Sequence, residues 1–178
     1  MKKTKPVVLT NRCPFARYVP ASPHNIGGYI DRSRVRLIVA HVAQGNNQSG
    51  IDAWFRNPNA KVSAHFSVSR FGIIHQHVDL DRIAWAEEDY NDVAWSIEHL
   101  GYSGKPLTRL ARIQSLRLIK WLHLQAPQVP LKRIANPNGH GVIGHGELGI
   151  PGGDHPDCPG NPILAQINVE LVALSRKK

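Results

Sequence analysis

The sequence predicts an α/β domain, because segments with the patterns of strands and of helices are interleaved along the chain. Strand-like segments occupy residues 36–45, 93–102 and 141–145. Helical spacing of apolar residues marks residues 107–127 and a closing segment at 161–175. With 178 residues, 42% of them hydrophobic, the chain can bury one sizeable core and is best described as a single domain. Loops of such a domain gather at the strand ends, where sites usually form.

The first segments lead from an irregular start into the core. Residues 1–35, which include CPFARYVPASPHNIGGY, predict a loop-rich N-terminal arm packed on the domain, and residues 36–178 predict the domain itself. The run RLIVAHVAQG is typical of a fully buried strand and ends at the polar ring of His41. Residues 49–59 then predict a short helix, which Pro58 stops.

Three further segments carry the alternation of strands. Residues 62–69 place apolar side chains on one face and Ser63, His65, Ser67 and Ser69 on the other. Their expected partner is the segment 73–80, after a turn at Phe71-Gly72. In VAWSIEHLGY, residues 93–102, the side chains of Ser96 and Glu98 share one face of the strand.

The long helix is expected over residues 107–127, capped by Thr108 and ended before Pro127. At 100° per residue its apolar stripe consists of Leu107, Leu110, Ala111, Leu118, Trp121 and Leu122. The opposite side carries Arg109, Arg112 and Lys120. We therefore expect this helix to cover a sheet.

The charge, the cysteine content and the first residues of the chain limit the kinds of partner and the kinds of protein that come into question. Lys and Arg total 22 against 13 acidic residues, and the net charge of +9 indicates attraction to a polyanion such as nucleic acid, a membrane surface or an acidic wall polymer. Two cysteines are too few for a disulfide framework. The start, MKKTKPVVLTNRC, has only a brief apolar run at residues 7–9, which predicts neither a signal peptide nor membrane insertion.

Candidate metal ligands end two strands and enter one loop. His41 and His145 each end a predicted strand, and Cys158 follows within the glycine- and proline-rich loop VIGHGELGIPGGDHPDCPG. Two imidazoles and a thiolate suit a tetrahedral zinc whose fourth position stays open, as in catalytic sites, whereas a structural site usually closes all four. The alternative is that each histidine is a hydrogen-bonded core residue and the polar loop arose by chance.

Longer motifs carry a resemblance to a known family. IVAHVAQG, AWFRNPNAKVSAHFSVSRFGIIHQHVDLDRIAWA, NDVAWSIEHLG, VIGHGEL and DCPG follow one another from about residue 20 to residue 160. In this order and spacing they resemble the zinc-dependent N-acetylmuramoyl-L-alanine amidases, which are related to phage lysozyme-like amidases and peptidoglycan recognition proteins. The resemblance implies a central mixed β-sheet flanked by helices, with a zinc groove at the strand ends. It also implies hydrolysis of the amide between the lactyl group of N-acetylmuramic acid and L-alanine.

The family's functional residues fall on matching positions of this chain. The Zn²⁺ ligands implied by the resemblance are His41, His145 and Cys158, and the catalytic carboxylate is Glu98. The alternative for Glu98 is an edge-strand surface residue. Zinc would lower the pKa of its bound water to roughly 7 and polarise the carbonyl, and Glu98 would act as general base and then pass the proton to the leaving nitrogen.

Two departures from the family pattern affect the transfer of roles. The family's oxyanion-stabilising residue lies two positions before the third ligand, where this chain has Pro156, so the role is assigned to His155, one residue earlier. After AW, Ala86 and Glu87 replace the histidine-glycine pair of many relatives, so substrate contacts there are not transferred. His65 is interpreted as a structural hydrogen-bonding residue rather than a residue bordering the groove, and Cys13 as an ordinary thiol.

Three classes of function remain for comparison. The first is a zinc amidase acting on peptidoglycan or muropeptides, the second a non-catalytic recognition module of the same fold, and the third a basic nucleic-acid-binding protein with a structural zinc. An open zinc position and Glu98 favour the enzyme, and the chain lacks a paired Cys-x-x-Cys motif or an RNA signature. Without an export signal, the protein is expected to act as an endolysin released to the wall, or in cytoplasmic muropeptide recycling. The oligomeric state is left open.

Overall fold

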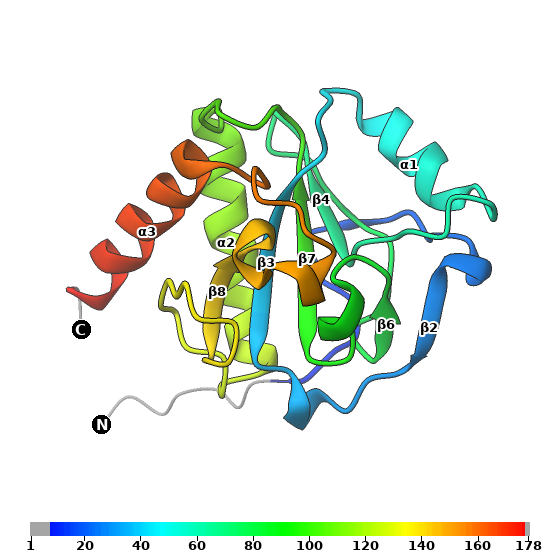
Figure 1. The fold of residues 1–178 in the computed structure, drawn as a ribbon, viewed down its shortest axis with the longest axis horizontal. Coiled ribbons are helices and arrows are strands. Elements are labelled where there is room, and N and C mark those ends of the chain that lie inside the picture. Colours follow the sequence, from blue (N-terminus) through cyan, green and yellow to red (C-terminus); the bar gives the residue numbers. More distant parts are fainter. Residues whose placement is uncertain (1–7, 177–178) are drawn as a thin grey trace.

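A computed structural model describes residues 8–176, and a mixed six-stranded β-sheet lies at their centre (Figure 1). From edge to edge its strands are β1 (Arg17–Tyr18), β5 (Ile74–Gln76), β4 (Phe66–Val68), β7 (Ala94–His99), β3 (Leu37–Val42) and β8 (Gly141–Gly144). A smaller sheet pairs β2 (Ile26–Tyr29) with β6 (Arg82–Ala84). The α-helices of the described residues are α1 (Gln48–Arg56), α2 (Arg109–Gln125) and α3 (Asn161–Ser175).

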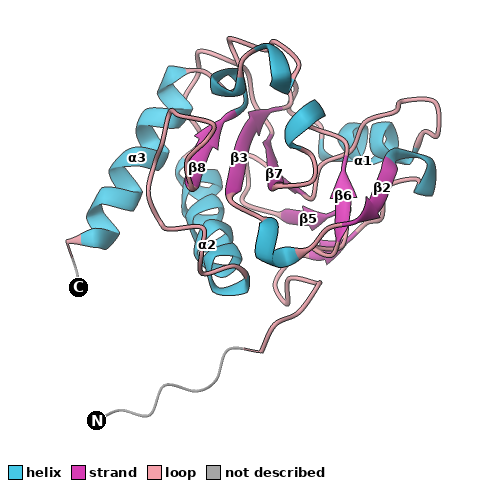
Figure 2. Ribbon diagram, turned by 60° about the horizontal axis from the view of Figure 1, so that its bottom comes forward, coloured by secondary structure: helices cyan, strands magenta, loops and turns pink. Residues whose placement is uncertain are grey.

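Helices α2 and α3 lie side by side against one face of the sheet (Figure 2). Ile38, Ala40, Trp95 and Ile97, which alternate along β3 and β7, are buried on this face. They belong to one core with side chains of the two helices: Leu118, Ile119, Leu122, Ile163, Ile167 and Leu171. The intervening residues of the same strands therefore point to the opposite face, where the candidate site lies.

The predicted fold class and most of the predicted elements are confirmed. α3 has the predicted bounds, and α2 follows Thr108, whose Oγ1 accepts a hydrogen bond from the backbone N–H of Ala111 at 3.2 Å. α2 ends at Gln125, two residues before Pro127. Proline disfavours the helical conformation of the residue before it, which here is Ala126. β4 and β5 pair in antiparallel fashion, as expected for residues joined by the turn at Phe71-Gly72.

Two details of the expected elements are wrong. Leu110 does not belong to the buried stripe of α2, because 51% of its surface is exposed. The helix instead turns Ser115 and Ile119 to the sheet, where Ser115 Oγ hydrogen-bonds His99 Nε2 at 2.8 Å. β4 is limited to Phe66–Val68, and the side chains on both of its faces are buried. Burial of the polar face follows from neighbours that an alternating pattern does not reveal.

The segment before β3 joins both sheets. β1 pairs in parallel with β5, and the Val19 N–H donates to the Gln76 carbonyl at 2.8 Å. β2 pairs with β6, and Cys13 is buried in the main core. Residues 1–7 of the predicted arm lie outside the described residues. Within the described part of the chain, no helix has the length and apolar character needed to span a membrane.

His65 is buried directly before β4 and links β6 to β7. Its Nε2 lies 3.1 Å from the carbonyl oxygen of Arg82, and its Nδ1 lies 3.1 Å from Ser96 Oγ. The carbonyl can only accept, so the neutral ring donates from Nε2 and accepts at Nδ1. Burial lowers the pKa of His65 to about 4, and the hydrogen bond to Arg82 opposes this shift. The interpretation of His65 as a structural residue agrees with these contacts.

We expect His65 to make folding sensitive to acid. The unfolded chain binds a proton at His65 near pH 6.5, whereas the folded chain does so near pH 4. The free energy of unfolding therefore falls between these values as pH is lowered, by about 3 kcal/mol for this residue. Urea unfolding of metal-free His65→Gln should show a shallower fall from pH 7 to pH 4.5 than wild type. His24→Gln, at an exposed position, is the matched control, and equal slopes for both variants would contradict the assignment.

Candidate active site

Strand register brings the candidate residues together at one edge of the sheet. β7, β3 and β8 are parallel neighbours, and His41 of β3 lies directly beside Glu98 of β7. Ala40 is paired with Gly144, so His145 follows β8 at the same level as His41. The carboxyl ends of parallel strands meet at one edge, and this places the three side chains around a common space.

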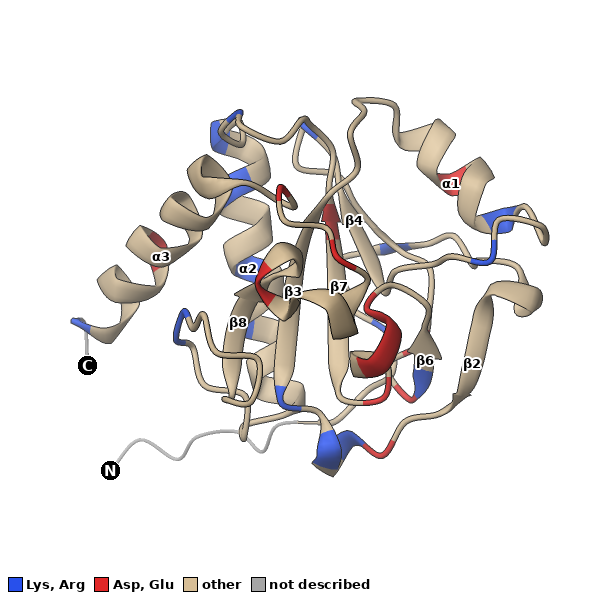
Figure 3. Ribbon diagram, viewed as in Figure 1, with Lys and Arg blue, Asp and Glu red and all other residues tan. Residues whose placement is uncertain are grey.

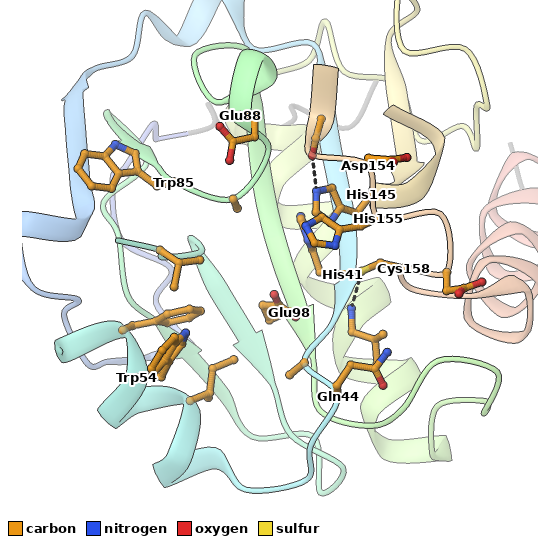
Figure 4. Close-up of a pocket in the computed structure, with 18 of the residues that line it drawn as sticks. His41, Gln44, Trp54, Trp85, Glu88, Glu98, His145, Asp154, His155 and Cys158 are labelled. Atoms are coloured by element: carbon orange, nitrogen blue, oxygen red, sulfur yellow. Dashed lines mark hydrogen bonds between the residues drawn. The ribbon is translucent and has the colours of Figure 1, made fainter. Parts of the chain in front are cut away.

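His41, His145 and Cys158 form a cluster suited to a metal ion. One ligand atom from each residue lies within 4.8 Å of the other two, and the two imidazole ring centroids are 4.2 Å apart (Figure 4). The Val42 N–H points to Cys158 Sγ at 3.4 Å, which ties the loop to the end of β3. Nitrogen and sulfur donors at this spacing are the ligands that a tetrahedral zinc prefers.

Hydrogen bonds fix which nitrogen of each imidazole faces the cluster. His41 Nε2 lies 3.0 Å from Glu87 Oε1, and His145 Nε2 lies 2.7 Å from the carbonyl oxygen of Gly152. The Gly152 carbonyl can only accept, which places the ring proton of His145 on Nε2, and an ionised Glu87 does the same for His41. Nδ1 of each ring is then the nitrogen with a lone pair available for a metal.

Burial also sets the protonation of the cluster. It lowers the pKa of His41 to about 3 and that of His145 to about 4, so both rings are neutral at physiological pH. It raises the pKa of the Cys158 thiol to about 12, with a further contribution from Glu98. A thiolate at this position therefore requires a positive charge beside it, which a bound cation would provide.

The loop that carries Cys158 packs closely on the turn after β8. The Gly146 N–H donates to the Cys158 carbonyl at 2.6 Å. A Cβ atom on Gly146 would lie 2.6 Å from the carbonyl oxygens of His155 and Pro156, so a larger residue would displace the loop. Behind the turn, Glu147 accepts a hydrogen bond from the Gly144 N–H at 2.8 Å.

A cavity of about 810 Å³ opens beside the cluster and has the size of a ligand-binding cleft. Glu98 lies close to the cluster of His41, His145 and Cys158, and Trp54 and Trp85 lie on the other side of the cavity (Figure 4). Burial raises the pKa of Glu98 to about 8, and the charge of Glu87 adds to this shift. Glu98 Oε2 is buried and has no hydrogen-bond partner among residues 8–176, which leaves it available to a ligand.

Charge is distributed unevenly around this cavity. Its lining includes Glu88, Asp154 and Asp157 as well as Lys61. Figure 3 shows acidic residues on the segments around β7, in front of the sheet, and many Lys and Arg residues at the periphery. The net positive charge of the chain is therefore not concentrated at the candidate site.

The structure brings every sequence-predicted site residue to this cavity. His155 is exposed, and its ring centroid lies 4.8 Å from that of His145. Glu98 stands on an interior strand between β4 and β3, so the alternative of an edge-strand glutamate is wrong. Asp157 is exposed, and its carbonyl oxygen accepts a hydrogen bond from Ser103 Oγ.

Sequence reasoning did not identify Glu87 and Trp54. Glu87 is completely buried against His41, although acidic residues are rarely buried. The only signal was its place in AWAEED, where the chain departs from the family pattern. Trp54 is 54% exposed on α1 and lines the cavity, whereas an amphipathic helix pattern would place such a side chain in the core.

Comparison with known proteins supports the resemblance. The N-acetylmuramoyl-L-alanine amidase family matches residues 31–161, which is most of the chain. The chain belongs to this amidase family. N-acetylmuramoyl-L-alanine amidase A of Achromobacter lyticus is 32% identical over 83 residues, covering 46% of this chain and 45% of that protein. The chain thus matches less than half the length of this relative.

Solved structures confirm the amidase fold. A selenomethionine derivative of AmpD superimposes with a TM-score of 0.71 and 26% identity, covering 92% of this chain and 98% of the other. The endolysin N-acetylmuramoyl-L-alanine amidase LysCS from Clostridium intestinale URNW has a TM-score of 0.69 and 15% identity, covering 91% and 98%. The expected mixed sheet flanked by helices is therefore the architecture of this family.

Proposed function

We propose that this amidase-family chain is a zinc-dependent N-acetylmuramoyl-L-alanine amidase that cuts the bond between the lactyl group of N-acetylmuramic acid and L-alanine. The observation that carries the proposal is the cluster of His41, His145 and Cys158 beside Glu98 in an open cavity. Its substrate is peptidoglycan or a muropeptide derived from it. A recognition module would need neither the available donor atoms nor a buried carboxylate beside them.

The residues present fit a zinc ion. Three protein ligands of the two-histidine, one-cysteine type leave a fourth position for water or substrate, as catalytic zinc sites do. The hydrogen bonds at both Nε2 atoms orient the rings so that Nδ1 is free. Neutral imidazoles need no deprotonation before binding, and only Cys158 must release a proton.

The side chains around the cluster supply the remaining chemistry. Bound zinc would polarise the scissile carbonyl and lower the pKa of water at the site. Glu98 accepts the proton of the attacking water and donates it to the departing nitrogen of L-alanine. Its raised pKa suits both steps, since a general base works best near the operating pH. His155, next to His145, would donate a hydrogen bond to the oxyanion.

We further propose that residues 36–178 form the catalytic unit and that residues 1–35 form an arm of the same single domain. The endolysin name of one structural relative favours action on the cell wall after release. Recycling of soluble muropeptides is the other setting for the same reaction. The two are distinguished by comparing hydrolysis of intact walls with that of soluble fragments.

The proposal predicts about one zinc ion per chain after gentle purification. A strong chelator should abolish hydrolysis of muropeptides, and stoichiometric zinc should restore it, because the donor atoms of His41, His145 and Cys158 lie close enough together to take the ion up again. Elemental analysis and an assay before and after chelation test both statements. Full activity in protein shown to be metal-free would contradict the proposal.

A further inference from the structure

Glu87 makes a contact with a proposed metal ligand that the amidase chemistry described above does not use. Its Oε1 lies 3.0 Å from His41 Nε2, and both side chains are almost fully buried, with 0% and 3% of their surfaces exposed. Oε2 of the same carboxylate is buried and has no hydrogen-bond partner among the described residues. A buried carboxylate with an unpartnered oxygen is costly, so packing alone does not account for it.

The backbone holds Glu87 in this position. Asn91 Oδ1 accepts hydrogen bonds from the N–H groups of Ala86 and Glu87, at 2.9 and 2.7 Å. The Tyr90 N–H donates to the Glu87 carbonyl at 2.9 Å, which closes the turn that follows. These contacts, all made by groups of the protein, hold the Glu87 side chain against His41.

The Nε2 atoms of the two histidines in the cluster face different hydrogen-bond partners. His145 Nε2 donates to the neutral backbone carbonyl of Gly152, whereas His41 Nε2 faces a carboxylate. A zinc ion bound by one thiolate and two neutral imidazoles leaves one unit of positive charge in a buried place. A carboxylate behind His41 can offset that charge and make the imidazole a stronger donor.

We propose that Glu87 is a positioning residue of the zinc site, which orients His41 through its Nε2 and compensates the charge of the bound ion. This inference rests on the proposed zinc-amidase function. Outer-shell carboxylates of this kind contribute about 10–100-fold to metal affinity. The family resemblance assigns no role to this position, because Ala86 and Glu87 replace the histidine-glycine pair of many relatives.

The test is the zinc dissociation constant, measured by competition with a chelator of known affinity. Glu87→Ala should weaken zinc binding by about 10–100-fold, because both the orientation of His41 and the charge are lost. Glu87→Gln keeps an acceptor oxygen and should lose less affinity than Glu87→Ala. Asp89→Asn is the matched control, because it removes one negative charge from an exposed residue of the same turn. Its affinity should stay within about twofold of wild type.

Circular dichroism of the metal-free variants shows whether each is folded before zinc is added. A folded Glu87→Ala or Glu87→Gln variant with wild-type zinc affinity would overturn the inference while leaving the proposed amidase intact. If wild type itself binds no zinc, both the inference and the proposed function fail. If Glu87→Ala does not fold, the Glu87→Gln measurement decides between the two outcomes.

Discussion

Replacing Cys158 by alanine is expected to abolish zinc binding and hydrolysis together, whereas Asp157→Ala should keep both. Cys158 Sγ lies in the cluster with His41 and His145, and its thiol is partly buried. Asp157 precedes it in the chain but is exposed. Loss of a direct ligand should exceed the roughly 10–100-fold effect of an outer-shell partner. Oxidation of the thiol should inactivate the protein for the same reason.

Cobalt substitution distinguishes the two neighbours directly. A thiolate-to-cobalt charge-transfer band should appear in wild type and in Asp157→Ala, and it should be missing from Cys158→Ala. Zinc content of the three proteins, measured in parallel, should follow the same pattern. A wild-type cobalt protein without this band would remove Cys158 from the ligand set and favour Asp157 as the third ligand.

Glu98→Gln should lose turnover by about 10²–10⁴-fold while keeping zinc and stability, because general acid–base catalysis contributes on this scale. The amide has nearly the shape of the carboxylate but cannot carry the proton from water to the leaving nitrogen. Burial already disfavours the charged form of Glu98, so the neutral amide should not destabilise the fold.

Single-turnover rates, zinc content and urea unfolding would be compared for Glu98→Gln, wild type and Glu170→Gln. Glu170 lies on α3 and pairs with Arg112, so its variant controls for loss of a carboxylate from the surface of a helix. Hydrolysis by Glu98→Gln at a rate near that of wild type would assign the base to another group.

The site residues that could be predicted from the sequence are those that stand out in a local sequence pattern or motif. His41 is the last but one residue of β3 and His145 directly follows β8, and a buried strand carries a polar ring only near its end or for a functional reason. Cys158 is a candidate because its donor atom lies in the same polar loop, but its assignment as the third ligand depends on the resemblance to the amidases, since a cysteine in a glycine-rich loop has no periodicity of its own. The parallel register that sets Glu98 beside His41 became visible only in the structure.

Other features depend on contacts between distant segments. β1 has only two residues, and both pair with the edge of β5. Two residues are too few to show the alternation of a strand, so the local sequence does not predict β1. The exposure of Leu110 depends on how α2 is rotated over the sheet, and two stripes of similar apolarity compete for that contact. Burial of Glu87 follows from the turn held by Asn91, which the residue types alone do not indicate.

The proposed function requires that the zinc-loaded protein cut one particular amide bond. Mass spectrometry of a purified muropeptide before and after incubation tests it most directly. We expect two products, a free stem peptide with L-alanine at its amino terminus and a muramyl saccharide with a free lactyl carboxylate, and neither should form after chelation. Intact muropeptide in the presence of fully zinc-loaded, folded protein, or cleavage at a glycosidic or other peptide bond, would contradict the claim.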